Sequence, residues 1–253
     1  MAGRVVLVTG GTRGIGAAIA GAFLDEGDRV VVCGRRAPEL PPRGKGGEAA
    51  FREADVRDPD EAAALIEAVV AEEGRLDVLV NNAGGTPATP AAEMSARSAA
   101  AVVELNLLAP FHLARHANAA MQRRDGGVIV NLGSTAAIRP AQGTAMYAAA
   151  KAGLAALTRA LALEWGPKVR VNLLTPGPVE TEGAARHYGG EEGLRAVHAT
   201  IPAGRMARPE DVAAACVLLA SPAAAFVSGA ELRVDGGGET PGWLVALRGA
   251  GDR

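Results

Sequence analysis

Tyr147 and Lys151, within the stretch MYAAAK, are the residues whose types and spacing most directly suggest chemistry. The chain has only two tyrosines and three lysines. The surrounding residues are rich in Ala and Leu and favour a helix, on which positions i and i+4 share one face. An ammonium group near a phenol favours the phenolate and lowers the tyrosine pKa toward neutrality. Tyr147 is therefore a candidate proton donor and acceptor. The alternative is two residues on a solvated helix face.

A glycine-rich turn follows the first apolar run of the chain. Val5–Val8 reads as a buried parallel strand, and the residues after the turn have helical spacing that ends at Gly27. In a strand–turn–helix unit, backbone N–H groups and the helix N-terminus can hold a pyrophosphate. The glycines are spaced G-x-x-x-G-x-G, which differs from the general G-x-G-x-x-G pattern. The candidate phosphate-binding residues are Gly10, Thr12, Arg13, Gly14, Ile15 and Gly16.

Strands and helices alternate along the chain, which predicts an α/β fold with a doubly wound parallel sheet of about seven strands. A chain of 253 residues, 49% of them hydrophobic, can bury one full core, so we expect a single domain over residues 1–253. The predicted strands are Val5–Val8, Arg29–Cys33, Ala50–Ala54, Val78–Val80, Val128–Leu132, Arg170–Leu174 and Glu231–Val234. The predicted helices are Ile15–Glu26, Pro59–Glu73, Ser98–Gln122, Ala145–Trp165 and Pro209–Leu219.

Two segments depart from this alternation. Residues 37–47 contain three prolines and three glycines, which do not sustain a helix. We expect a short loop there, leaving that flank of the sheet less covered. Residues 182–205, after the sixth strand, are expected to be irregular.

Composition excludes several classes of protein. A net charge of −2 with interspersed signs gives no basic stripe for nucleic acid. No apolar run approaches the ~18–20 residues of a membrane span. The N-terminus lacks the hydrophobic region of a signal peptide. Cys33 and Cys216 are too few for a disulfide framework, which favours a cytoplasmic location. His112 and His116 have i, i+4 spacing, but Leu113 replaces the Glu of the zinc metalloprotease motif, so we predict no metal site.

Several motifs agree in order and spacing with one protein family. They are Thr9–Gly16, Asn81-Asn82-Ala83-Gly84, Asn106, Ser134, Tyr147 with Lys151, and Val234-Asp235-Gly236-Gly237 near the end. With these motifs the chain resembles the short-chain dehydrogenase/reductase family, and specifically its single-domain branch of about 250 residues. The resemblance covers nearly the whole chain and implies a Rossmann-type fold. Within the family, the 3-oxoacyl carrier-protein reductases are the closest general resemblance.

The resemblance implies four catalytic residues. Ser134 would hydrogen-bond the substrate carbonyl oxygen, and Tyr147 would give that oxygen a proton. Lys151 would lower the tyrosine pKa and hold the ribose hydroxyls of the cofactor. Asn106 would position a water that connects Lys151 to solvent. The structural alternatives are a turn residue for Ser134 and a helix-bend residue for Asn106. Ser134 lacks the G-x-S-x-G elbow of a hydrolase.

The resemblance also implies cofactor contacts beyond the glycine turn. Asp55 and Val56 would contact the adenine, Asn82, Ala83 and Gly84 would support the cofactor floor, and Val179 and Thr181, after Pro176 and Gly177, would hold the nicotinamide carboxamide. Asn82 has an alternative role as a brace for the neighbouring loop. These segments follow strand ends, where ligands bind in doubly wound sheets. Residues 182–205 would form a lid over the substrate, and His187 and Tyr188 lie there either as substrate contacts or as exposed loop residues.

Charge at the end of the second strand favours NADP over NAD. An NAD site places an acidic residue against the ribose hydroxyls about 20 residues past the glycines, whereas an arginine suits a 2′-phosphate. The second strand here ends Cys33-Gly34-Arg35-Arg36, and Arg13 adds a further cation. We expect Arg35 to bind the 2′-phosphate. The alternatives are simple solvated charge for these arginines and NAD as the cofactor.

The sequence therefore predicts an NADP(H)-dependent oxidoreductase that interconverts a ketone and a secondary alcohol. The alternatives are an NAD-dependent dehydrogenase of a small alcohol, sugar or steroid, and a non-catalytic nucleotide-sensing protein on the same fold. The helix Ala145–Trp165 is small or apolar almost all round, as expected of a helix buried on more than one side. In the resembled family such helices pair across two-fold axes, so we expect a homotetramer, with a dimer as the alternative.

Overall fold

The computed structural model describes residues 3–139, 141–242 and 244 of the chain. All seven predicted strands are present within one or two residues of their expected bounds and form one sheet. The domain range predicted from the sequence includes residues outside the described part. The strands of the sheet are β1 (Val5–Thr9), β2 (Arg29–Gly34), β5 (Ala50–Glu53), β6 (Val78–Asn81), β7 (Gly127–Leu132), β8 (Val169–Pro176) and β9 (Glu231–Val234).

The sheet is parallel throughout, with the strand order β5-β2-β1-β6-β7-β8-β9. The order reverses direction between β1 and β6, which lie side by side. In a doubly wound sheet this switch point is where two loops diverge above the carboxyl ends of the strands and leave a crevice. The glycine turn after β1 and the Asn82–Gly84 segment after β6 flank that crevice.

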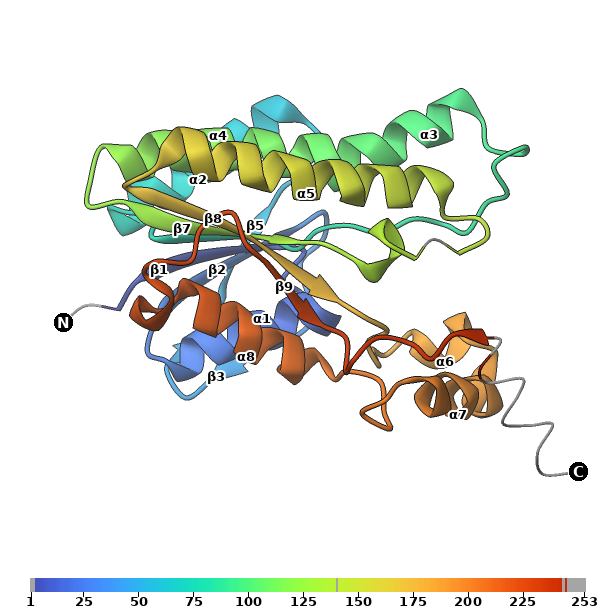
Figure 1. Ribbon diagram of the computed structural model, residues 1–253. Helices are drawn as coiled ribbons and strands as arrows, with labels where there is room; N and C mark the ends of the chain where they lie inside the picture. Colours follow the sequence, from blue (N-terminus) through green and yellow to red (C-terminus); the bar gives the residue numbers. More distant parts are fainter. Residues whose placement is uncertain (1–2, 140, 243, 245–253) are drawn as a thin grey trace, which may run out of the picture.

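Two layers of helices cover the sheet, as Figure 1 shows. Helices α1 (Gly14–Asp25) and α8 (Pro209–Ala220) pack on one face, with a core that includes Ile19, Phe23 and Cys216. Helices α2 (Pro59–Glu73), α4 (Ala109–Gln122) and α5 (Ala145–Trp165) cover the other face. All residues of β1 and β6 are buried, because both faces of these central strands are covered.

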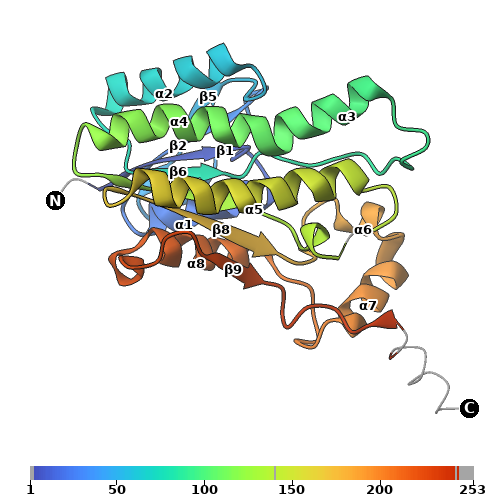
Figure 2. The same ribbon diagram turned by 45° about the horizontal axis from the view of Figure 1, so that its top comes forward.

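The outer side of α5 has no partner among the described residues. Its buried residues are five of 21, and Leu163 is 87% exposed. Figure 2 shows α4 and α5 lying side by side on the outside of the sheet. The apolar residues predicted to be buried on two sides are thus covered on one side only in a single chain.

The structure corrects three sequence predictions. The helix expected over 98–122 is three elements, because α3 (Ala96–Val103) passes into a π-helical turn (Glu104–Leu108) before α4. The loop expected over 37–47 carries a small hairpin, β3 (Arg43–Gly44) and β4 (Gly47–Glu48), and the main chain of Gly44 packs on α1. The hairpin thus packs on α1, and the described residues between β2 and β5 form no helix.

The third correction concerns the segment over 182–205. It contains the short helix α6 (Ala184–His187) and the longer helix α7 (Gly190–Thr200), where irregular chain was expected. A small apolar core of its own (Ala184, Ile201 and Met206, with Tyr188, Leu194 and Val197 against it) explains why helices form in a stretch that contains several glycines. We call residues 182–206 the lid, and Figure 1 places it beyond the carboxyl ends of β8 and β9.

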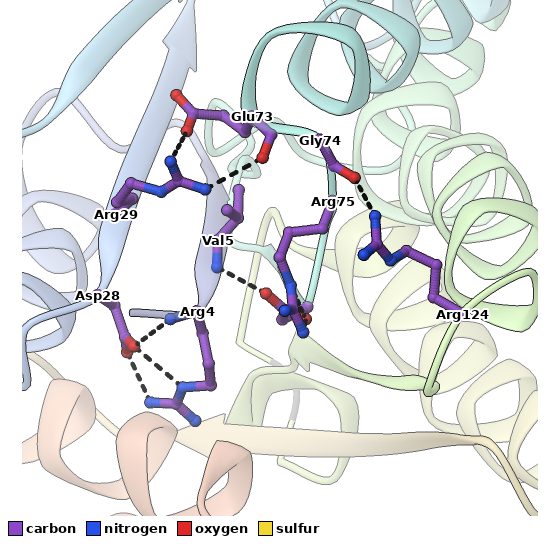
Figure 3. A network of polar contacts seen from close by, with 9 residues as sticks. Arg4, Val5, Asp28, Arg29, Glu73, Gly74, Arg75 and Arg124 are labelled. Carbon is purple, nitrogen blue, oxygen red and sulfur yellow. Dashed lines mark hydrogen bonds and ion pairs between the residues drawn. The ribbon is translucent and has the colours of Figure 1, made fainter. Parts of the chain in front are cut away.

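Paired charges close the amino ends of the strands. Arg4 binds both carboxylate oxygens of Asp28, at 3.1 and 2.6 Å. Asp77 accepts hydrogen bonds from the backbone of Val5 at 2.7 Å and from Arg75 at 2.6 and 2.9 Å. Figure 3 shows this network, which ties β1 to the segments that precede β2 and β6.

Candidate active site

The segments proposed as the site meet at the carboxyl edge of the sheet. Ser134 lies just beyond β7, the glycine turn beyond β1, and Asn82–Gly84 beyond β6. Tyr147 and Lys151 lie in the first two turns of α5, which packs beside β8. Residues far apart in sequence, such as Gly10 and Lys151, are thus gathered at one edge.

Ser134, Tyr147 and Lys151 form a cluster. The Ser134 hydroxyl lies next to the Tyr147 phenol, and the Lys151 Nζ lies 5.8 Å from the centroid of the Tyr147 ring. Ser134 Oγ also accepts a hydrogen bond from the backbone of Ala136 at 3.2 Å. This bond fits the turn-residue role kept as the alternative for Ser134, and it leaves the hydroxyl proton available to a further acceptor.

Lys151 is a buried cation. Its side chain is 3% exposed, and Nζ donates a hydrogen bond to the Leu132 carbonyl at 2.7 Å. No ion pair within the described residues includes Lys151. Burial lowers the pKa of Lys151 to about 8. A lysine with this pKa can exchange a proton near neutral pH.

The pKa of Tyr147 differs from the sequence expectation. Burial raises the pKa of the phenol, and the neighbouring Ser134 hydroxyl opposes this only in part. Burial is the larger of these two effects, and the Lys151 ammonium group lies over the face of the same ring. Tyr147 is therefore held as a protonated phenol, the form that a general acid needs.

Asn106 is fully buried in the π-helical turn between α3 and α4. Its Nδ2 donates to the carbonyls of Gly85 and Val102, both at 2.9 Å, and its Oδ1 accepts from the backbone N–H of Gly85 at 2.9 Å. A Cβ added at Gly84 would lie 2.9 Å from Asn106 Oδ1 and 3.3 Å from Lys151 Nζ. Asn106 thus joins the π-helical turn to the 84–85 loop beside Lys151.

The glycine turn is suited to an anionic group. Helix α1 begins at Gly14 without a side-chain cap and without an acidic residue in its first turn. Its first N–H groups lack intrahelical partners and carry the positive end of the helix dipole. A Cβ at Gly16 would lie 2.3 Å from the Gly10 carbonyl, so only glycine allows the turn to fold back so closely. These features fit a dinucleotide diphosphate at the turn.

Asn82 braces the same turn. Its Nδ2 donates to the carbonyls of Thr9 at 2.8 Å and Gly10 at 3.1 Å. The backbone N–H groups of Asn82 and Ala83 both donate to Thr9 Oγ1 at 3.0 Å. These bonds match the bracing role kept as the alternative for Asn82. They hold the glycine turn against the segment that follows β6.

The exposed Arg35 follows β2 beside the glycine turn. The glycine turn lies close to the end of β2, because a Cβ added at Gly34 would lie 3.5 Å from the Thr12 methyl group. Neither Arg13 nor Arg35 has an ion-pair partner in the described part of the chain. Asp55 lies at the end of the neighbouring strand, where a hydrogen bond from Arg57, with a smaller contribution from Arg35, lowers its pKa.

Some of the remaining predicted cofactor residues are buried in the core, and another lines an open hollow on the surface. Val56 and Pro176 are buried. Val179 bridges to Ala207 and packs partly on the core, as Ile15 does. A hollow of about 650 Å³ beside the turn is lined by Gly14, Ala17, Ala18, Glu180, Thr181, Glu182, Arg208, Pro209 and Glu210. The charged groups of this lining are three carboxylates and the Arg208 guanidinium.

The histidines noted in the sequence lie on α4 and in the lid. The described residues contain no group of three or more His, Cys, Asp or Glu side chains placed to hold a metal ion. His112 and His116 lie on α4, and His116 contacts Arg115 at 3.1 Å. In the lid, His187 is exposed and its ring stands edge-on to Tyr188 at 4.7 Å. No helix among the described residues is long and apolar enough to span a membrane.

Sequence comparison connects this arrangement to known enzymes. A family profile described as enoyl-(acyl carrier protein) reductase matches residues 10–239. D-threitol dehydrogenase of Mycolicibacterium smegmatis is 39% identical over 241 residues, covering 93% of this chain and 92% of that protein. The 3-oxoacyl-[acyl-carrier-protein] reductase of Vibrio cholerae is 36% identical and covers 93% of this chain and 97% of that protein.

Solved structures agree with the sequence comparison. The ligand-free aldohexose dehydrogenase of Thermoplasma acidophilum matches with a TM-score of 0.87 and 31% identity, covering 93% of each chain. A short-chain type dehydrogenase/reductase from Mycobacterium ulcerans matches with a TM-score of 0.85 and 30% identity, covering 97% of this chain and 94% of that one. The protein therefore belongs to the short-chain dehydrogenase/reductase family and is an oxidoreductase that acts on CH–OH or carbonyl groups.

Proposed function

We propose that the protein interconverts a ketone and a secondary alcohol with NADP(H), and that Tyr147 is its general acid and base. The observation that carries this proposal is the buried Lys151 ammonium, without a carboxylate partner among the described residues, beside the phenol of Tyr147 and the hydroxyl of Ser134. Burying a cation without a counter-ion is unfavourable, so its presence beside a proton donor indicates chemistry.

The chain's own residues would handle the substrate oxygen. Ser134 donates a hydrogen bond to the carbonyl oxygen and orients it toward the phenol. Tyr147 delivers its proton to that oxygen as negative charge develops there, and Lys151 stabilises the phenolate that remains. A bound nicotinamide cofactor supplies the hydride. In the reverse direction Tyr147 takes the proton from the alcohol. An intact set of these three residues favours an enzyme over the nucleotide-sensing alternative, since a sensor needs no proton donor.

The preference for NADP rests on the end of β2. Arg35 and Arg13 are exposed cations without an ion-pair partner in the described chain, and Asp55, which is close enough for Arg35 to lower its pKa, pairs with Arg57. A 2′-phosphate would supply the missing anion. We expect kcat/KM to be higher with NADPH than with NADH, and Arg35→Asp to reverse this order. Steady-state kinetics at the nicotinamide absorbance measure both, and a wild-type preference for NADH would contradict the assignment.

We specify the reacting groups, a ketone carbonyl and a secondary hydroxyl, and do not specify the rest of the substrate. The relatives are named for a polyol, a sugar, a hydroxysteroid and acyl substrates. A panel with one member of each class, tested with NADPH and NADH in both directions, identifies the best substrate. Turnover of none of these classes with either cofactor would contradict the proposed reaction.

We further propose a homotetramer, with a dimer as the alternative. Most exposed residues of α5 are alanines, although Arg159 and Glu164 are exposed too. Leu163 is 87% exposed, and Leu108 at the start of α4 is exposed as well. Closed symmetry buries such faces against their own copies. We expect light scattering at micromolar concentration to give four chains per particle, and a monomer would contradict this proposal.

A further inference from the structure

Arg139 connects the loop after Ser134 to the C-terminal segment, two regions that lie 100 residues apart in sequence. Its Nη1 lies 3.1 Å from Glu239 Oε2 and donates to the Glu239 carbonyl at 3.3 Å. Its Nη2 lies 3.6 Å from Asp235 Oδ2. We propose that Arg139 is a positioning residue, which holds residues 235–240 and, through them, the lid against the loop that carries Ser134.

The Ser134 end of this connection is rigid. The backbone N–H of Arg139 donates to the Thr135 carbonyl at 2.9 Å, and that of Ala137 donates to the Ser134 carbonyl at 3.0 Å. The short 3₁₀ turn Thr135–Ala137 therefore fixes the start of the Arg139 side chain relative to the Ser134 hydroxyl. A displacement of Arg139 would therefore also move the Ser134 hydroxyl, which is proposed to donate a hydrogen bond to the substrate oxygen.

The other end is bound to the lid. Ala203 N–H donates to the Gly236 carbonyl at 3.0 Å, and Thr240 N–H donates to the Thr200 carbonyl at 2.6 Å. Burial, with a contribution from Glu239, raises the pKa of Tyr188, which places this lid residue close to the same carboxylate. Residues 235–240 thus lie between the lid and Arg139, and they carry any force from one to the other.

The sequence of the segment is adapted to this contact. A Cβ at Gly238 would lie 2.9 Å from both terminal nitrogens of the Arg139 guanidinium, and Gly238 has a φ of +85°. Any other residue there would displace the arginine and strain the backbone. The two carboxylates lie on either side of this glycine in the sequence, at Asp235 and Glu239. The glycines at 236–238 therefore leave space for the guanidinium and also allow the chain to turn.

Amide hydrogen exchange tests the contact without any substrate. The amides of Ala203, Gly238 and Thr240 are the reporters, since each donates a bond at or next to the segment. In Arg139→Ala we expect these amides to exchange about threefold to fivefold faster, the size typical of a partly exposed ion pair. Amides of the buried strand β1 should not change. Arg139→Lys, which keeps the charge but loses the fork, should restore part of the protection.

Arg43→Ala is the matched control. Arg43 binds Glu48 at 2.8 Å in the β3–β4 hairpin, also as a partly exposed pair, but away from the lid. It should leave the reporter amides and the kinetics unchanged. Unchanged exchange of the reporter amides in Arg139→Ala would overturn the proposal.

The kinetic arm rests on the proposed function. With the substrate found by the panel, Arg139→Ala should raise KM about threefold and leave kcat within about twofold, because a loosened lid weakens substrate binding uniformly. Added salt should raise the wild-type KM in the same way and leave that of the variant unaffected. An unchanged KM despite faster exchange would overturn the positioning role. Absence of any turnover in the wild type would refute the proposed function and leave the exchange result standing.

Discussion

The two ends of the sheet differ in whether their charged groups have partners within the chain. At the amino ends, shown in Figure 3, Asp28 and Asp77 each have an arginine within 2.6 Å and a backbone N–H as a second donor. At the carboxyl ends, Lys151 is buried with a single carbonyl partner among the described residues, and the N-terminus of α1 has no side-chain cap. One end satisfies its charges within the chain, and the other leaves donors available.

This difference separates stability from chemistry. Paired and hydrogen-bonded carboxylates at the amino ends join strands and stabilise the fold. Unsatisfied donors and a buried cation at the carboxyl ends are unfavourable for the fold and become useful when a substrate or cofactor supplies the missing partner. The contrast leads to three predictions, ordered from the largest expected effect to the smallest.

Tyr147→Phe should have the largest effect. Removing the phenolic hydroxyl removes the proposed proton donor, and general acid–base catalysis contributes about 10²–10⁴-fold to the rate. We expect kcat to fall by that amount, while the affinity for NADPH, measured by cofactor fluorescence, stays nearly unchanged. A variant that keeps more than about a tenth of the wild-type kcat would refute this role.

Lys151 should make the stability of the folded chain depend on pH. Burial lowers its pKa in the folded state from 10.5 to about 8, so between these values the unfolded chain binds more protons than the folded chain. The unfolding free energy of the wild type should therefore rise from pH 8 to pH 10.5 relative to Lys151→Met, by at most about 3 kcal/mol.

Urea unfolding of the two proteins at several pH values checks this. Burial also raises the pKa of Cys33 and Cys216 to about 12, which lowers stability above pH 9, but both proteins share this effect and it cancels in the difference. A difference between wild type and Lys151→Met that is flat or falls across the range would contradict a desolvated lysine.

Asp77→Asn should reduce stability by a smaller amount. The asparagine side chain has one acceptor oxygen, and its NH₂ group would face either Val5 N–H or Arg75, which are both donors. One buried hydrogen bond is therefore lost, which lowers the free energy of unfolding by about 1–3 kcal/mol. Urea unfolding at fixed protein concentration measures the change. Glu48→Gln in the exposed hairpin is the control and should change stability by less than about 0.5 kcal/mol. An equal effect of the two substitutions would show that the amino-end network does not stabilise the fold.

The strands and the cluster at their carboxyl ends were predictable from the sequence. Runs such as Val5–Val8 and Val78–Val80 are apolar because both faces of the sheet are covered, so they identify buried parallel strands without structural data. Parallel strands place their following loops at one edge, which gathers Ser134 with the segment after β6. The placement of Tyr147 and Lys151 on one face of α5 was predictable because residues i and i+4 of a helix share a face.

Features decided by tertiary contacts were not predictable. The π-helical turn around Asn106 forms where its amide bonds Gly85, which comes 21 residues earlier, and apolar spacing carries no signal for such a bond. Helix α7 begins at Gly190 in a glycine-rich stretch and depends on the lid core. The pKa of Tyr147 follows from burial, which the motif alone did not reveal. Arg139 gave no sequence signal beyond its position five residues after Ser134.

The most direct test of this division compares Tyr147→Phe with Asp77→Asn in both properties at once. On the same preparations, kcat with NADPH and the unfolding free energy in urea are measured for each variant. We predict that Tyr147→Phe loses about 10²-fold or more in kcat with little change in stability, and that Asp77→Asn loses about 1–3 kcal/mol with kcat within about twofold. Loss of kcat in Asp77→Asn comparable to that in Tyr147→Phe would contradict the account.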